Sequence, residues 1–322
     1  MQILGNIFSV ILYLSFIGSI VSFAALFSKK VLHLVQPLWF GAAGLLFYLV
    51  PVIVPQVRLI PGERQTWRYG FRTAAIIWIT GAFLFALCYL ARTLFAARAM
   101  RKCTICGDAR VLKILTEICT GERLQKIPRV LFGEFKDPVC VVTILRPYIL
   151  LNKRILPELT DPELAVILRH EILHIKRKHH LLQRFYDLAS VLHWCNPFVW
   201  ISKNDFELIC EMDCDRKVLK SCTELAPGDY TRTMLHLLEM SSGTGKNTGG
   251  RIAALGFLMV KQRFAAILAY PKHIWRIITL AILGGLVAAA VLLSMSASRT
   301  YFYPYPALMG PAEYSDPDAQ RF

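Results

Sequence analysis

The chain has 322 residues, of which 55% are hydrophobic, and its formal net charge is +15. Soluble domains are usually about 45–50% apolar, so this composition argues against a wholly soluble protein. No nucleic-acid-binding motif accompanies the basic charge, so we expect it to face the anionic headgroups of a lipid bilayer and expect no direct binding of nucleic acid.

Four apolar segments have the length of about 20 residues that a helix needs to cross a bilayer. They are residues 1–28, 31–57, 73–91 and 277–297. The first lacks the basic start of a signal peptide, so we expect it to be retained as a span. The sequence thus predicts three transmembrane helices in residues 1–92, a domain in 93–276, a fourth transmembrane helix at 277–297 and a short extracytoplasmic tail at 298–322.

Basic residues near the ends of these segments predict the orientation, because they favour the cytoplasmic side of a membrane. One side would carry Lys29, Lys30, Arg92, Arg98, Arg101, Lys102, Lys272 and Arg276, and the other Arg58, Arg64, Arg68, Arg72, Arg299 and Arg321. The excess on the first side predicts a multi-pass protein of the bacterial plasma membrane whose domain 93–276 is cytoplasmic. Its cysteines would then stay reduced, and the isolated Cys103–Cys106 pair predicts no zinc finger.

The domain has a mixed pattern of helices and strands. Apolar periodicity and turn residues predict a helix over 107–127, strands at Val130–Phe132, Val139–Val142 and Ile149–Leu151, a helix from Thr160, and two further helices over 181–194 and 205–219. The helix at Thr160 begins with a capping box that ends at Glu163. Residues 241–250 have low complexity and predict a flexible loop.

The strongest chemical signal lies within the helix that begins near Thr160, where residues 170–174 read His-Glu-Ile-Leu-His. Positions i and i+4 of a helix share one face, so the imidazoles of His170 and His174 can bind one Zn²⁺ ion. Glu171 beside them can act as the general base that takes a proton from the attacking water. Five-residue matches of this kind also occur by chance, but this one falls within a capped helix, as the chemistry requires.

A catalytic zinc site needs a third protein ligand and an open position. The helix predicted from Asp205 offers Glu211, and Asp215 follows four residues later on the same face. Glu211 would complete the metal site, and Asp215 would accept the free ring N–H of one histidine. Spacing alone leaves Glu207 as an alternative ligand, and it also allows the simpler interpretation that 205–215 is an acidic helix face.

Several further motifs stand in a fixed order around these residues. They are the Arg146–Leu151 strand, the basic run Lys176-Arg177-Lys178 after the second histidine, Trp194-x-Asn196-Pro197, Trp200, Glu211-x-x-Cys214-Asp215 and Arg263-x-x-x-Ile267-Leu268. The combination resembles the bacterial antirepressor zinc metallopeptidases, the sensor-transducers of the BlaR/MecR type. The resemblance implies a mostly α integral membrane protein with four spans and a cytoplasmic α+β zincin domain of the gluzincin kind between spans three and four.

The same resemblance implies the function and selects among the ligands. It makes Glu211, rather than Glu207, the third zinc ligand beside His170 and His174. It also implies a zinc endopeptidase in signal transduction, which cleaves a cytoplasmic winged-helix repressor, itself, or both. Self-cleavage would fall between residue 241 and Arg263.

Two features depart from that family. Relatives often carry an acid where this chain has His179, so we expect a local hydrogen bond to differ. The β-lactam sensors continue into a large penicillin-binding domain, whereas only residues 298–322 follow the fourth predicted span here, and Ser-x-x-Lys does not occur. We therefore expect the signal to arrive through the spans, the external loops or a separate sensor partner.

Three alternative functions fit the sequence less well. A non-catalytic membrane signalling scaffold, with structural or absent zinc, would not need the intact His-Glu-x-x-His motif. A transporter subunit is disfavoured because no acidic residue lies within the four predicted spans. Membrane zinc peptidases of the heat-shock or prenyl-protein type place apolar spans between the two metal motifs, whereas residues 175–210 here contain Lys176, Arg177, Lys178, Arg184, Asp187, Lys203, Asp205 and Glu207 and predict no span.

Overall fold

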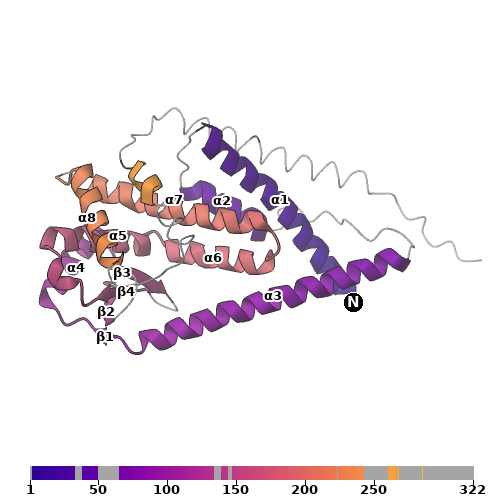
Figure 1. Cartoon of the computed structure of the whole chain (residues 1–322), viewed down its shortest axis with the longest axis horizontal. Helices are drawn as coiled ribbons and strands as arrows, with labels where there is room; N and C mark the ends of the chain where they lie inside the picture. The colour runs from indigo at the N-terminus through magenta and orange to yellow at the C-terminus, as the bar shows by residue number, and fades with distance from the viewer. Residues whose placement is uncertain are drawn as a thin grey trace, which may run out of the picture.

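Three helices at the N-terminus lie beside a mixed α and β region (Figure 1). The computed structural model describes residues 2–32, 38–49, 65–133, 139–143, 147–222, 224–242, 260–265, 267 and 285. The N-terminal helices are α1 (Gln2–Leu32), α2 (Leu38–Leu49) and α3 (Gln65–Met100). By length and composition, Ile7–Phe27 of α1 and Arg72–Met100 of α3 could each cross a membrane. The second predicted span is described only in part, as α2, and the fourth lies outside the described residues except for Gly285.

Large apolar side chains of α1 and α3 face outward. Phe16 is 65% exposed, Phe83 62% and Phe95 69%. Soluble proteins rarely expose apolar side chains along whole helices, so these surfaces fit helices that face lipid.

A four-stranded sheet follows the N-terminal helices in the chain. Its strands are β1 (Thr104–Ile105), β2 (Arg129–Gly133), β3 (Val139–Thr143) and β4 (Pro147–Asn152). The spatial order is β1-β2-β4-β3; β2 and β4 are parallel, and the two outer pairs are antiparallel. The three strands predicted from sequence are β2, β3 and β4, whereas the short strand β1 was not predicted.

Two helices and the sheet enclose the main core. Helix α4 (Ala109–Gly121) is shorter than the predicted 107–127, and α5 (Asp161–Lys176) follows the 3-10 turn η1 (Leu156–Glu158). Thr160 and Glu163 form the predicted capping box at the start of α5. Leu164, Leu168 and Ile172 of α5 pack in a cluster that also contains Ile149 and Leu151 of β4. Because one face of α5 is fixed in this core, the remaining faces are held in place beside it.

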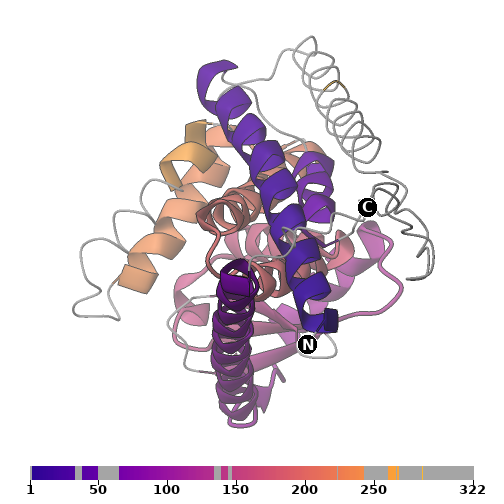
Figure 2. The same ribbon diagram turned by 90° about the vertical axis from the view of Figure 1, so that its right-hand side faces the viewer.

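Two long helices form a hairpin that contacts the N-terminal helices. They are α6 (His179–Leu192) and α7 (Pro197–Ser221). Helix α7 begins at Pro197 rather than near Asp205, because Asn196 caps it and Pro197 fits the first turn. Both α6 and α7 pack on α2, and α7 also packs on α1, which crosses in front of them in Figure 2.

The last long helix described is α8 (Pro227–Ser242). It packs against α5 and includes the first two residues of the predicted flexible loop 241–250. Residues 243–250 of that loop lie outside the described part of the chain. Beyond them, residues 260–265 are helical.

Candidate metal centre

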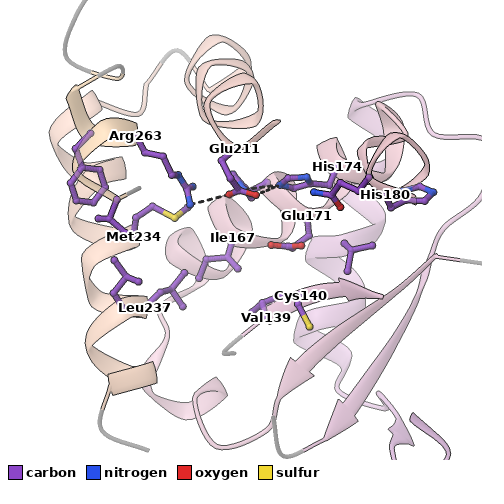
Figure 3. A pocket seen from close by; sticks show the side chains of 16 residues that line it. Val139, Cys140, Ile167, Glu171, His174, His180, Glu211, Met234, Leu237 and Arg263 are labelled. Atoms are coloured by element: carbon purple, nitrogen blue, oxygen red, sulfur yellow. Dashed lines mark hydrogen bonds and ion pairs between the residues drawn. The ribbon is translucent and has the colours of Figure 1, made fainter. Parts of the chain in front are cut away.

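A cleft of 420 Å³ is lined by four of the residues that the sequence singled out (Figure 3). Helix α5 contributes His170, Glu171 and His174, and α7 contributes Glu211. Arg263, from the helical segment after α8, also lines the cleft. Residues 139–141 of the edge strand β3 form another wall.

Three side chains converge at one point in this cleft. The Nε2 atoms of His170 and His174 lie 3.1 Å apart. Glu211 Oε2 lies 3.3 Å from His170 Nε2, and Glu211 Oε1 lies 3.3 Å from His174 Nε2. Glu207, one turn earlier in α7, is not among the described residues that line the cleft.

The residue types and the distances between their donor atoms are close to those of a tetrahedral zinc site. Zn²⁺ binds imidazole nitrogens and carboxylate oxygens at about 2.0–2.2 Å, and tetrahedral geometry then places neighbouring ligand atoms about 3.3–3.6 Å apart. The three measured separations lie within a few tenths of an ångström of that value. Two histidines and one glutamate also leave a fourth position open, as a catalytic zinc site requires.

The electrostatics of the cleft favour a cation at this point. Burial would lower the pKa of His170, but hydrogen bonds with Asp215 and Glu211 raise that pKa to about 10. Burial would raise the pKa of Glu211, but His170 and His174 hold it well below its ordinary value. The protonated imidazole of His170 thus places a positive charge between the two carboxylates, and a bound metal ion would supply that positive charge instead.

Glu171 lies in the same cleft but does not point at the three converging atoms (Figure 3). Burial raises the pKa of this carboxyl above its ordinary value, while the charges of His170 and His174 lower it. A general base works best when its pKa lies near the operating pH, so the shift is in the useful direction.

A buried network supports His170 from behind. Asp215, which is 1% exposed, places Oδ1 3.3 Å from His170 Nδ1. Tyr230 donates from its hydroxyl to Asp215 Oδ1 at 2.6 Å and lies 3.2 Å from His170 Nδ1. Arg263 donates from Nε to Asp215 Oδ2 at 2.9 Å and from Nη2 to Oδ1 at 2.7 Å. Its Nη1 also lies 2.9 Å from Glu211 Oε2.

His174 has a different support. Its Nδ1 lies 3.1 Å from Nδ1 of His179, which is fully buried. His179 stands where family relatives often carry an acid, so here an imidazole, in place of a carboxylate, contacts the His174 ring. Outer partners of this kind set which ring nitrogen of a ligand histidine carries the proton.

Cys214 offers a second grouping with His170 and His174, because its Sγ lies within 4.8 Å of a ring nitrogen of each. Two observations favour Glu211 over this thiol. Cys214 Sγ contacts Nδ1 of His179 at 3.5 Å, on the side of His174 away from Glu211. Burial also raises the pKa of the Cys214 thiol, whereas metals bind the thiolate.

Comparison with known proteins places the chain in a family. A model of the BlaR1 peptidase M56 family matches residues 60–267. The chain belongs to this family. The family consists of metallopeptidases, and the resemblance to BlaR/MecR-type proteins is thereby confirmed.

Individual members of the M56 family are distant. The regulatory protein BlaR1 of Bacillus licheniformis is 24% identical over 197 residues, which cover 60% of this chain and 32% of the relative. The methicillin resistance mecR1 protein of Staphylococcus aureus is 24% identical over 200 residues, which cover 61% of this chain and 34% of the relative. The chain thus aligns with about a third of the length of these curated relatives.

Three residues of this M56 site were not assigned a role from the sequence. Tyr230 carried no signal, because a lone tyrosine in a helix has no distinctive spacing. His179 was noted only as a departure from the family pattern. Arg263 belongs to the Arg263-x-x-x-Ile267-Leu268 motif, but nothing in its local sequence connects it to Asp215, which lies 48 residues earlier.

If His170 binds a metal ion, replacing Tyr230 by phenylalanine is expected to weaken the binding of added Zn²⁺ by a factor of about 10, because outer partners of ligand histidines contribute about 10–100-fold to affinity. Asp215 keeps its contacts with Arg263, so the loss should fall at the lower end. Competition with a fluorescent zinc chelator measures the affinity. Tyr148→Phe, on β4 away from the cleft, is the matched control and should bind zinc like the wild type; equal weakening in both variants would contradict the role of Tyr230.

Proposed function

We propose that this M56 family member is a membrane zinc endopeptidase in signal transduction. Its substrate is a cytoplasmic repressor of transcription, the chain itself, or both. The observation that carries this proposal is the convergence of His170, His174 and Glu211 at separations of 3.1 and 3.3 Å beside Glu171. The names of the relatives, a regulatory protein and a methicillin resistance protein, support a regulatory role.

His170, His174 and Glu211 would hold the zinc ion, with Asp215 orienting His170 from behind. Bound zinc would act as a Lewis acid that polarises the scissile carbonyl and makes water more acidic. Glu171 takes a proton from the attacking water and passes it to the leaving amine. The raised pKa of Glu171 makes its carboxylate a stronger base for the first of these proton transfers.

The walls of the cleft suit an extended peptide. Val139 and Val141 of the edge strand β3 form one side, and Met234 and Leu237 of α8 form another. Apolar walls around a few polar groups are typical of sites that bind and orient a substrate. A peptide lying between β3 and α5 would pass Glu171 on its way through the cleft.

The membrane part of the proposal rests on the exposed apolar faces of α1 and α3. It comprises three spans in residues 1–92, a cytoplasmic domain over 93–276, a fourth span at 277–297 and an outer tail at 298–322. This arrangement places the cleft on the side of the membrane where a repressor is found, and it leaves the spans or a separate sensor to receive the signal.

Zinc content per chain tests the metal site. We expect about one zinc ion per detergent-purified wild-type chain, and a sharp loss in both His174→Ala and Glu211→Gln, because each change removes one of three protein ligands. Glu207→Gln is the matched control in the same helix and should keep its zinc. Elemental analysis of protein expressed with added zinc makes the measurement. Metal-free wild type would overturn the proposal, and metal lost from Glu207→Gln but kept in Glu211→Gln would reassign the third ligand.

A further inference from the structure

The closed end of the α6–α7 hairpin binds the middle of α1 (Figure 1). Asn196, in the turn between the two helices, donates from Nδ2 to the hydroxyl oxygens of Ser15 at 2.7 Å and Ser19 at 2.9 Å. The same Nδ2 lies 3.2 Å from the backbone oxygen of Ser15. The other atom of the amide, Oδ1, accepts from the backbone N–H of Phe198 and caps α7. The turn is therefore fixed to α1 through a fully used side chain.

The same turn is fixed to α3. Trp194 donates from Nε1 to the backbone oxygen of Trp78 at 3.1 Å, and Trp78 donates from Nε1 to the backbone oxygen of Leu192 at 2.9 Å. The Trp194 ring lies against Gly81, where an added Cβ would come within 2.3 Å of it. It also stacks on Phe85 with ring centroids 5.8 Å apart. Glycine at 81 is thus needed for the ring to fit.

These contacts lie deep within the apolar helices. At 1.5 Å per residue, Ser19 lies about 12 Å and Ser15 about 18 Å along α1 from Phe27, the end of its apolar segment. Half of a bilayer core is about 15 Å. The apolar part of α3 begins at Arg72, which is its end farthest from the sheet, and Trp78 lies only about 9 Å along the helix from that end. The turn therefore reaches at least the middle of the bilayer that α1 and α3 would cross.

Several polar groups of the hairpin are paired with other protein groups, although the Nδ1 atom of His193 is buried without a partner among the described residues. His193 Nε2 lies 3.0 Å from the backbone oxygen of Tyr48, and Tyr186 donates from its hydroxyl to the backbone oxygen of Gly41 at 2.8 Å. Lys203 Nζ lies 2.6 Å from Asp187 Oδ1, and both side chains are less than one-fifth exposed. Irregular backbone and ionisable groups occur at membrane depth where other protein groups pair with them.

One face of α6 remains exposed and is apolar except for Arg184, which is 42% exposed and donates to the hydroxyl of Tyr89 on α3. Leu181, Phe185 and Leu188 stand at positions i, i+4 and i+7 and are 46%, 43% and 48% exposed. Helix α6 packs beside α3, whose exposed side chains include Phe83. The exposed leucine and phenylalanine side chains of α6 thus belong to a helix that packs beside one whose own surface is suited to lipid.

We infer that the α6–α7 hairpin, unlike the rest of the proposed cytoplasmic domain 93–276, is inserted into the hydrocarbon core beside α1, α2 and α3, with Leu181, Phe185 and Leu188 facing lipid acyl chains. This inference rests on the proposed membrane location. Helix α6 has 14 residues, about 21 Å, so it enters the bilayer and turns without crossing it. The metal centre then lies at the open end of the hairpin, close to the membrane surface.

Photo-crosslinking tests which surroundings α6 has. The photoreactive amino acid p-benzoyl-phenylalanine replaces either Leu188 or Phe185 in the full chain. Phenylalanine is the natural residue closest to the probe, so the change at Phe185 is conservative. Each variant is reconstituted into phosphatidylethanolamine–phosphatidylglycerol nanodiscs. Phe83 on α3 is the control for lipid contact. Leu112 on α4 is the matched control, since it is 41% exposed but belongs to a helix of the core beside the sheet. Adducts are identified by mass.

We expect phospholipid adducts at Leu188, Phe185 and Phe83, and none at Leu112. Lipid adducts at Phe83 without any at Leu188 and Phe185 would overturn the hairpin inference and leave the membrane proposal intact. Crosslinks from Leu188 and Phe185 to a second chain, or to residues 277–297, would also overturn it and identify what covers the face. Absence of lipid adducts at all four positions would refute the membrane location itself.

Discussion

Replacing Glu171 by glutamine is expected to leave the zinc content near one per chain and to lower the rate of peptide cleavage by a factor of about 10²–10⁴. Glutamine keeps the size and polarity of the side chain but cannot take a proton. The metal should stay, because Glu171 is not one of the three converging groups. This separation of binding from reaction distinguishes a catalytic base from a ligand.

The measurement uses two readouts on nanodisc-reconstituted protein. One is release of fluorescence from labelled casein, and the other is the intact mass of the chain, which reports self-cleavage between residue 241 and Arg263. Glu117→Gln, on the exposed face of α4, is the matched control and should behave like the wild type. Undiminished cleavage by Glu171→Gln would remove Glu171 from the mechanism.

The same variant separates a peptidase from a signalling scaffold. A scaffold transmits its signal through changes of shape, so Glu171→Gln would signal normally in cells. A peptidase needs the reaction, so the variant would bind zinc and remain silent. A reporter gene controlled by the cognate repressor makes this comparison with the wild type and with Glu117→Gln.

Local patterns were sufficient to predict that His170 and His174 lie on one face of α5. The capping box at Thr160 fixes the start of that helix, and the spacing of His170 and His174 then places both rings on one face. The predicted start of α7 at Asp205 is wrong, and the reason is also local. Asn196-Pro197 was interpreted only as the end of the preceding helix, although an Asn cap and a first-turn proline also begin one.

Contacts between residues far apart in the sequence, in the site and in the α6–α7 hairpin, could not be predicted from local patterns. Tyr230 and Arg263 meet Asp215 from 15 and 48 residues away, and only the packing of α8 and the segment after it brings them there. The charges between the two metal motifs argued against a span. Asp187 and Lys203 pair across the hairpin, so a count along the sequence overstates the cost of burying them.

Replacing Arg263 by alanine is expected to lower the free energy of unfolding by about 3–5 kcal/mol, because it leaves a buried carboxylate without its partner. Asp215 is 1% exposed, and its carboxylate accepts hydrogen bonds from both Nε and Nη2 of Arg263. Burial raises the pKa of Asp215, but hydrogen bonds from His170 and Arg263 outweigh this and lower it to about 2, so the carboxylate stays charged at neutral pH.

Thermal unfolding in detergent, with zinc and with a chelator, measures this effect. Arg263→Lys keeps the charge but not the paired hydrogen bonds, so we expect an intermediate loss. Arg232→Ala is the matched control: its partner Asp229 is 59% exposed, and exposed pairs contribute little, so its melting temperature should not change. Combining Arg263→Ala with Asp215→Asn removes the buried charge as well and should recover part of the stability. If the double variant were as unstable as the sum of the two single ones, the two residues would not be coupled, and Arg263 would stabilise the fold by packing alone.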